Sequence, residues 1–109
     1  MVPPMLQCRC GHAALTLFDG SVVALGGYGG GSDYLRSVEL LDPSLSRWIP
    51  LPPMAVSRSG PAAVVGPGGA IYVAGGSPDG RVGHKSLERL VGLIFVCFFF
   101  STCRVRWLW

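Results

Sequence analysis

Charged residues are scarce in this sequence, and it has no long hydrophobic run. Only 14% of its 109 residues are charged and half are hydrophobic, a composition that argues against a disordered chain. The apolar run at residues 90–103 is 14 residues long, short of the roughly 20 that a membrane-spanning helix needs. A chain of this length holds one small domain at most, which excludes two complete enzyme domains.

The few charges are also unevenly placed. Residues 1–80 hold four basic and five acidic side chains, whereas residues 81–109 hold five basic side chains and one acidic side chain. The whole basic excess therefore lies at the C-terminal end, and the body carries no footprint for a nucleic-acid surface. We predict that nucleic acid is not among its partners.

A gapless internal repeat with a 49-residue period organises most of the chain. Residues 3–27 align with residues 52–76, and ten of these 25 pairs are identical. The register continues weakly as far as the pair Leu41 and Leu90, and then ends. Low complexity alone does not fix a single register in this way, so the repeat predicts two similar structural units.

Within one unit the residue pattern is that of short β-strands. Two β-prone runs, residues 13–17 and 21–25, are separated by Phe18-Asp19-Gly20, and Asp-Gly is a strong hairpin-turn signal. A third strand is expected at residues 37–41, before Asp-Pro, and a fourth at residues 47–51, before Pro-Pro. Four strands per repeat describe one blade of a β-propeller.

The cysteines, by contrast, form no C-x-x-C pair and no zinc-finger spacing. Cys8, Cys10 and His12 recur at every second position, so in a strand they would share one face and suggest a metal site. Their partners at the 49-residue offset are Ser57, Ser59 and Pro61. These partners cannot repeat a ligand role and no fourth ligand lies near, so we predict no metal. We expect Cys8, Cys10, Cys97 and Cys103 to be free thiols, as in a reducing compartment.

Motifs for nucleotide binding and catalysis are missing as well. The glycine-rich segment at residues 26–31 contains no G-x-G-x-x-G and is not followed by Gly-Lys-Ser/Thr, so a phosphate loop is excluded. His12 and His84 are the only histidines, and neither lies in a motif beside a nucleophile. We therefore predict no catalytic residue, no cofactor and no enzyme activity.

Taken together, these features resemble kelch repeats. The family pattern is an arginine before a small-residue strand, a strand that ends in Gly-Gly, a V-E-x-x-D-P segment, a tryptophan, and L-P-x-M before the next arginine. The first unit matches at Arg9, Gly26, Gly27, Val38, Glu39, Asp42, Pro43, Trp48, Leu51, Pro52 and Met54. The second unit matches at Arg58, Ile71, Tyr72, Val73, Gly75, Gly76 and Glu88.

This resemblance implies an all-β fold, an incomplete kelch-type β-propeller fragment of about two four-stranded antiparallel blades. Residues 1–51 would be the first kelch repeat, residues 52–90 an incomplete second repeat, and residues 91–109 an apolar tail outside the repeat. The second unit lacks the Asp-Pro and the tryptophan, and Val23 and Leu41 stand where the family often has tyrosine. In the family the tryptophan packs between blades, which assigns Trp48 to the core.

Fewer than two blades cannot close a propeller, which usually has four to eight. Truncation of a longer kelch protein is favoured, because the repeat stops inside a strand and an unrelated composition follows. Association of several copies, or an arrangement other than a closed propeller, stays open as an alternative.

The function implied by the resemblance is non-catalytic protein–protein interaction, as in substrate adaptors of cullin-type ubiquitin ligases or in actin-associated proteins. A protein partner would be bound through the propeller loops, where recognition residues concentrate. The candidate loop residues are Tyr28, Asp33, Tyr34, Arg36, Ser77, Asp79, Arg81 and His84. His84 is expected to be a solvated loop side chain.

The apolar tail leaves two possibilities open. Arg89, Arg104 and Arg106 flank residues 90–103, and tryptophans follow, so an interfacial membrane anchor is one alternative. The favoured expectation is a β-prone strand over residues 93–100 that covers the unfinished second blade or stays exposed and prone to aggregation. Because the N-terminal residues include no basic n-region, no secretory signal is expected and the predicted location is cytoplasmic, with membrane association as the alternative.

Overall fold

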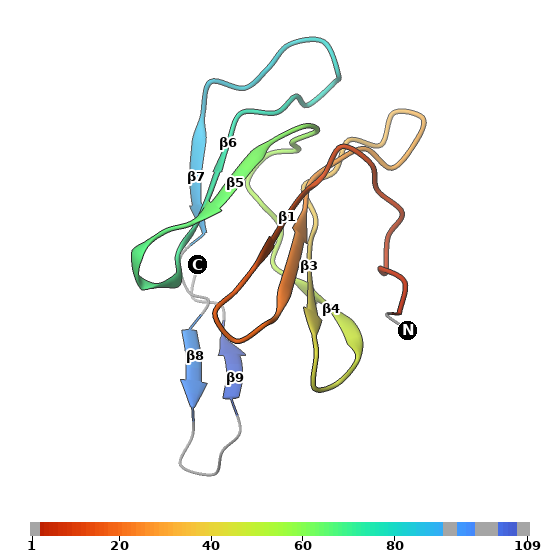
Figure 1. Cartoon of the computed structure of the whole chain (residues 1–109). Coiled ribbons are helices and arrows are strands. Elements are labelled where there is room, and N and C mark those ends of the chain that lie inside the picture. Colours follow the sequence, from red (N-terminus) through yellow and green to blue (C-terminus); the bar gives the residue numbers. More distant parts are fainter. Residues whose placement is uncertain (1–2, 91–93, 98–102, 107–109) are drawn as a thin grey trace.

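The computed structural model describes residues 3–90, 94–97 and 103–106, and these residues form three antiparallel sheets (Figure 1). The first sheet consists of β1 (Ala13–Thr16), β2 (Val22–Leu25), β3 (Val38–Asp42) and β4 (Arg47–Leu51). The second consists of β5 (Ala62–Val65), β6 (Ile71–Ala74) and β7 (Leu87–Leu90). A hairpin of β8 (Ile94–Cys97) and β9 (Cys103–Arg106) makes the third.

The repeat period of the sequence is also the period of the structure. β5, β6 and β7 begin at the positions that the repeat makes equivalent to the first residues of β1, β2 and β3. Both sheets pair their strands in sequence order, so each repeat is a simple antiparallel meander. The prediction of an all-β fold built from two antiparallel repeats is confirmed.

Among the described residues, the second blade has three strands, whereas the first blade has four. The equivalent of β4 falls at residues 96–100, of which residues 96 and 97 are described, in β8. β8 pairs with β9 in a separate two-stranded sheet, so it does not extend the sheet β5–β7. The reason is visible in the sequence, because the repeat register ends at Leu90.

Tight polar turns set the ends of the strands. In the turn between β1 and β2, the Leu17 N–H donates to the Ser21 carbonyl (2.8 Å), and the Asp19 carboxylate accepts from the Ser21 N–H (2.9 Å). Leu17 and Ser21 therefore belong to the turn, and both strands are one residue shorter than predicted. β3 begins at Val38 and runs on to Asp42, one residue later at each end than expected.

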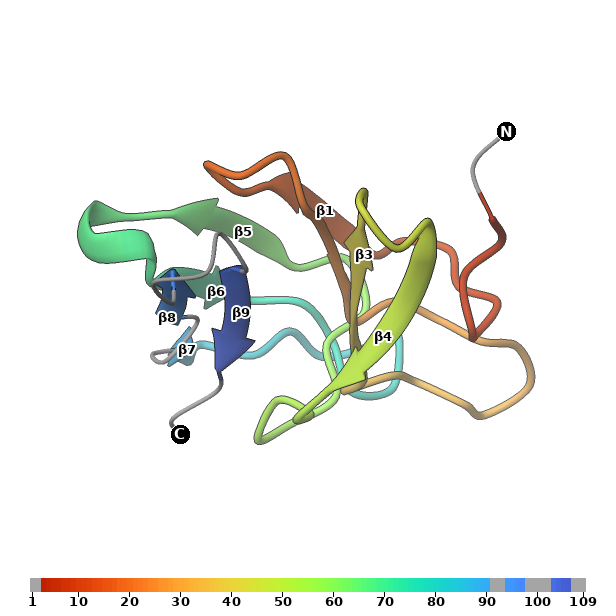
Figure 2. The same ribbon diagram turned by 90° about the horizontal axis from the view of Figure 1, so that it is seen from below.

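One apolar core joins the two sheets, which lie side by side with β1 next to β5 (Figure 2). Side chains alternate along each strand, so every second residue of β2 and β3 points toward the second sheet. The buried cluster consists of Leu17, Val23, Leu25, Val38, Leu40, Met54, Ile71, Val73 and Leu90. Burial of one such aliphatic side chain contributes roughly 1.5–3 kcal/mol, so this shared cluster is the main reason that the two repeats pack together.

Trp48 does not join that cluster, which corrects the expectation of a core position. In β4 the side chains of Ile49 and Leu51 pack on the cluster, and alternation turns Trp48 to the opposite face. There it is half-buried, and its indole N–H donates to the Pro3 carbonyl at 3.0 Å. The N-terminal segment, rather than a second blade, is its neighbour.

The expected strand at residues 93–100 is described only over Ile94–Cys97, which is β8, and the rest of that range lies outside the described residues. Within the described part of the chain, no helix has both the length and the apolar character required to cross a membrane.

Candidate protein-binding loop surface

Two buried arginines, Arg9 and Arg58, hold the loops at the end of the molecule where β2 is connected to β3 and β6 is connected to β7. The Arg9 guanidinium donates to the carbonyls of Gly26 (2.9 Å) and Ser37 (3.1 Å), to Ser37 Oγ (3.0 Å) and to the Glu39 carboxylate (2.6 Å). Its side chain is 0% exposed, and that of Glu39 is 3% exposed. The Arg9 side chain thus binds both ends of the β2–β3 loop, at Gly26 and at Ser37.

Arg58, the equivalent of Arg9 in the second repeat, makes the same set of contacts. Its guanidinium donates to the carbonyls of Gly75 (2.7 Å) and Ser86 (3.1 Å), to Ser86 Oγ (2.8 Å) and to the Glu88 carboxylate (2.9 Å). Five donors in a planar fork suit this combination of carbonyls and a carboxylate, which lysine cannot reproduce. Arg9 and Arg58 therefore fix the two ends of the β2–β3 loop and of the β6–β7 loop.

Arg58 also joins the two blades through its backbone. Its N–H donates to the Leu35 carbonyl (2.9 Å), and its carbonyl accepts from the Gly27 N–H (2.7 Å). Gly26 has a φ of +66°, and a methyl group there would collide with the Arg58 carbonyl. The Gly-Gly of the first repeat is thus required both by its backbone conformation and by the close approach of the second blade.

The two loops that carry the predicted partner-binding residues lie at the same end of the molecule (Figure 1). In the β2–β3 loop, the Tyr28 and Tyr34 rings pack against each other with centroids 4.9 Å apart, and the Tyr28 hydroxyl donates to the Gly31 carbonyl (2.6 Å). A methyl group at Gly80, in the β6–β7 loop, would lie 2.8 Å from the Tyr34 hydroxyl oxygen. The two loops are therefore in contact and present one continuous surface.

The β6–β7 loop is built around Ser77 and Asp79. The Asp79 carboxylate accepts from the N–H groups of Arg81 (2.8 Å) and Val82 (3.1 Å), and the Ser77 hydroxyl donates to the Val82 carbonyl (2.9 Å). The hydrogen bonds from the backbone of Arg81 and Val82 lower the pKa of Asp79 below its ordinary value of 3.8, because they favour the charged form. The exposed side chains of this loop are thus presented from an ordered turn.

His84 differs from its expected solvated state. It is half-buried, and its Nε2 lies 2.8 Å from the Ser57 carbonyl, in the segment between β4 and β5. The His84 N–H also donates to the Gly76 carbonyl (2.7 Å), which closes the base of the loop. His84 therefore supports the β6–β7 loop. Asp79 and Arg81 of that loop are exposed, and so are Asp33 and Arg36 of the β2–β3 loop.

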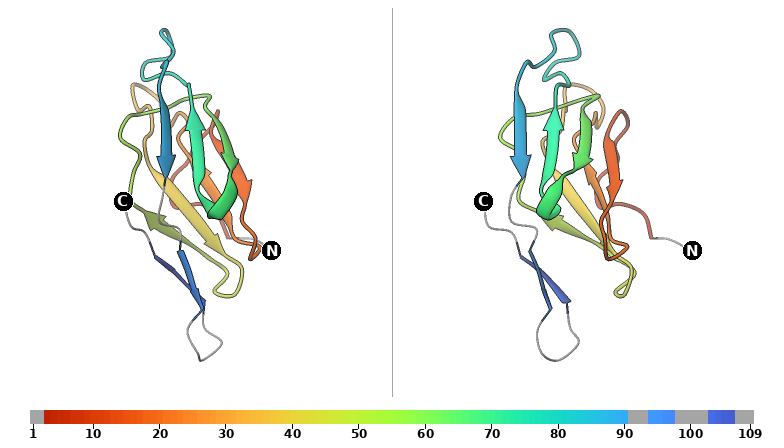
Figure 3. Two further views of the ribbon diagram at one scale, coloured as in Figure 1. Left: turned by 90° about the vertical axis from the view of Figure 1, so that its left-hand side faces the viewer. Right: turned by 60° about the vertical axis from the view of Figure 1, so that its left-hand side comes forward.

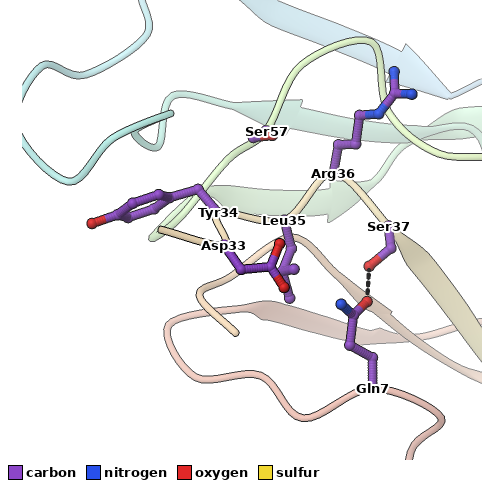
Figure 4. A pocket seen from close by; sticks show the side chains of 7 residues that line it. All are labelled: Gln7, Asp33, Tyr34, Leu35, Arg36, Ser37 and Ser57. Carbon is purple, nitrogen blue, oxygen red and sulfur yellow. Dashed lines mark hydrogen bonds between the residues drawn. The ribbon is translucent and has the colours of Figure 1, made fainter. Parts of the chain in front are cut away.

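A shallow polar pocket of about 290 Å³ opens beside the β2–β3 loop (Figure 4). Gln7, Asp33, Tyr34, Leu35, Arg36, Ser37 and Ser57 line it. Three of these are predicted partner-binding residues, and Figure 4 shows the side chains of Tyr34 and Arg36 extending in different directions. Ser37 Oγ donates to Gln7 Oε1 (2.7 Å) on one wall.

Prediction from sequence did not single out Gln7, Leu35, Ser37 or Ser57 as pocket residues. Ser37 has a signal that the repeat provides, because it recurs as Ser86 and both serines bind an arginine. Gln7 and Ser57 have none, because their partners at the 49-residue offset are Val56 and Cys8. Only the packing of separate segments brings them to the loop.

A metal centre finds no support on this surface. Over residues 3–90, no three side chains of His, Cys, Asp or Glu are grouped closely enough to hold a metal ion. Cys8 and Cys10 are exposed free thiols. The Nδ1 atom of His12 is buried with no hydrogen-bond partner among the described residues.

Comparison with known proteins agrees with the repeat geometry. Residues 9–55 match the family model of the kelch motif. The chain is 33% identical over 90 residues to Kelch-like protein 34 of Homo sapiens, an alignment that covers 82% of this chain. It spans only 14% of the length of that relative. The matched motif, the paired blades and the two arginine clamps show that the chain belongs to the kelch-repeat proteins.

Proposed function

We propose that this chain is a non-catalytic protein-interaction module that binds its partner through the loop surface formed by residues 26–37 and 75–86. Support comes from the kelch motif and from the way the loops are built. The arginine clamps and the Asp79 turn hold two long loops in contact, so a binding surface exists before a partner arrives.

The observation that carries this proposal is the arrangement of the charged side chains around the polar pocket. Arg36 and Asp33 are exposed at the pocket, and Arg81 and Asp79 are exposed on the neighbouring loop. Charges of both signs on an ordered surface favour a partner segment that carries charges of its own, because charge complementarity selects among partners. A short polar peptide segment fits a shallow pocket of this kind.

The finer role follows the family. A substrate adaptor of a ubiquitin ligase or an actin-associated protein is the proposal that the kelch resemblance suggests, and it concerns a longer assembly than these residues. A cytoplasmic location belongs to the same proposal, because exposed cysteines such as Cys8 and Cys10 stay reduced in that compartment. No observation on the described residues favours the membrane-associated alternative.

Selection of peptides from a random displayed library against the full chain tests the proposal. Enriched peptides should lose at least tenfold in affinity, measured by fluorescence polarisation, when Arg36→Glu reverses the charge at the pocket. Arg47→Glu is the matched control, because Arg47 is an exposed arginine of β4. Failure to enrich any peptide, or equal affinity for both variants, would contradict the proposal.

A further inference from the structure

Each of the two large sheets has two faces. In the first sheet, we call the face that packs on the second sheet the downstream face and the opposite face the upstream face. Equivalent residues of the repeat define the same two faces in the second sheet. In the first sheet, the downstream face packs toward the second sheet, and its Leu25 and Val38 are 0% and 1% exposed. The equivalents in the second sheet are Ala74 and Leu87, which are both exposed, Leu87 at 61%. Val64, on the same face, is also 61% exposed. The downstream face of β5–β7 thus lacks the cover that the first sheet has.

Figure 3 views the molecule from this open side, with β5–β7 in front of β1–β4. The face is apolar apart from Arg89 and the half-buried Tyr72, which pair across β6 and β7. Their equivalents in the first sheet are Leu40 and Val23. A long arginine side chain can lie along an apolar surface with its guanidinium at the rim, so Arg89 does not prevent the face from being covered.

The upstream face of the first sheet is open along β1, whereas Ala24 of β2 and Glu39 of β3 on the same face are buried. In the second sheet the upstream residues Ala63 and Val65 are half-buried, because they pack on the shared cluster. Their equivalents in the first sheet, Ala14 and Thr16, are exposed. The two described sheets β1–β4 and β5–β7 therefore present two unlike open surfaces, and these are the two kinds of face that pack together between the sheets.

The backbone hydrogen bonds that join the two blades differ in the same way from their equivalents on the open faces. Inside the chain, four donors reach carbonyls of the neighbouring blade: Met54 N–H to Arg36 (2.8 Å), Arg58 N–H to Leu35 (2.9 Å), Gly27 N–H to Arg58 (2.7 Å) and Gly60 N–H to Gly11 (2.7 Å). Among the described residues, the equivalent groups at the two ends have no such partners. At the upstream end these are the N–H groups of Met5, Arg9 and Gly11 and the Arg9 carbonyl. At the downstream end they are the carbonyls of Gly60, His84 and Lys85 and the Gly76 N–H.

We propose that a second copy of this chain docks head to tail, so that the downstream face of β5–β7 in one copy packs on the upstream face of β1–β4 in the next. The internal interface supplies the template. The apolar faces of this interface have exposed equivalents on the two open faces. The donors and acceptors of its four backbone hydrogen bonds also have equivalents there, and each donor on one open face matches an acceptor on the other. Such a heterologous interface closes into a ring when the rotation permits, and about two to four copies would give the four to eight blades of a propeller.

Native mass spectrometry and light scattering of the full chain test this directly. The wild type should show assemblies at multiples of 11.5 kDa that grow with concentration. Leu87→Glu should block the downstream face and Ala14→Glu the upstream face, so each variant alone should be monomeric. Because each keeps one good face, a mixture of the two should form a one-to-one heterodimer that grows no further. Leu45→Glu, at a turn residue that is 53% exposed, is the matched control and should assemble like the wild type.

A second variant separates docking from folding. Gly75 has a φ of +70° and no atom within 4 Å of a methyl group, although the equivalent methyl at Gly26 would collide with Arg58. In the docked pair, a methyl at Gly75 would meet the Arg9 carbonyl of the second copy, so Gly75→Ala should be a monomer that keeps its circular dichroism spectrum. Gly68→Ala, at a φ of +75° with equally open space, should still associate.

The following outcomes would overturn the proposal. A wild type that is monomeric at every concentration rules out the second copy, and leaves blades of a longer chain as the occupant of the face. Association that survives both Leu87→Glu and Ala14→Glu assigns it to the apolar tail. A mixture that stays monomeric excludes head-to-tail pairing. None of these results bears on peptide binding at the loops, so this inference and the proposed function can fail separately.

Discussion

The two arginines of the repeat show how much of a blade can depend on one side chain. Arg9 and Arg58 are both fully buried, and each bonds to two loop carbonyls, one serine and one glutamate. A buried charge of this kind is tolerated only because the terminal guanidinium nitrogens find partners, and removal of the arginine takes the ion-pair partner from a buried or half-buried glutamate. Arg58 carries the further task of joining the blades through its own backbone.

Arg58→Met should therefore be strongly destabilising. It removes the ion-pair partner of the Glu88 carboxylate and one hydrogen-bond donor from each of two carbonyls, and loss of one partner from a buried ion pair costs about 3–5 kcal/mol. The free energy of unfolding from urea titration checks this. Arg36→Met changes the same residue type at an exposed loop position, and should stay within about 0.5 kcal/mol of the wild type. Equal losses in the two variants would show that the clamp does not stabilise the fold.

At the scale of elements, the loops are held by local side-chain turns, as well as by the strands that they connect. Asp79 organises the β6–β7 loop, and Asp42 does the same between β3 and β4, where its carboxylate accepts from the Ser44 N–H (2.9 Å) and hydroxyl (2.7 Å). The Ser44 hydroxyl is the main cause of the lowered pKa of Asp42. Both loops should thus depend on ionised aspartates.

Acidification should loosen the β6–β7 loop before the sheets unfold. The pKa of Asp79 is lower in the folded loop than its ordinary value of 3.8, so the carboxylate stabilises the loop above that pH. This stabilisation is lost as the pH falls through the folded pKa. The amide NMR shifts of Arg81 and Val82 should follow that titration. In Asp79→Asn the acid-dependent change should disappear, and its persistence there would assign the titration to another group.

At the scale of the whole molecule, the two blades share one core. Residues from β2, β3, β6 and β7 contribute to a single buried cluster, and β1 lies against β5. A structure with one contiguous core usually unfolds in a single cooperative transition. Each sheet covers the buried face of the other.

Ile71→Ala in the second sheet should consequently lower the stability measured at Trp48 in the first. Ile71 is 0% exposed, and truncation of a buried isoleucine to alanine costs about 2–5 kcal/mol. Urea unfolding followed by Trp48 fluorescence, with Trp107 and Trp109 replaced by Phe, reports on the first sheet alone. Val82→Ala, at a 68% exposed loop position, should leave the midpoint unchanged. An unchanged midpoint in Ile71→Ala would mean that the sheets unfold independently.

Local chemistry was sufficient to predict the repeat, most strand positions and the all-β fold. The repeat period, the turn at Asp19-Gly20 and the breaks at Pro43 and Pro52 can all be read along the chain without a partner segment. The sequence also shows why the sheet β5–β7 has no fourth strand among the described residues, because the repeat register ends at Leu90.

Contacts between distant segments settled the rest. Trp48 turns from the core toward Pro3, His84 reaches Ser57, and Gln7 lines a pocket with Asp33, although the members of each pair are far apart in the chain. No local pattern specifies such a meeting, since it depends on how one blade packs on the next. The two open faces likewise emerge only from comparison of equivalent side chains in the folded repeats. Leu25 and Ala74 are both apolar residues directly before Gly-Gly, but Leu25 is buried and Ala74 is exposed.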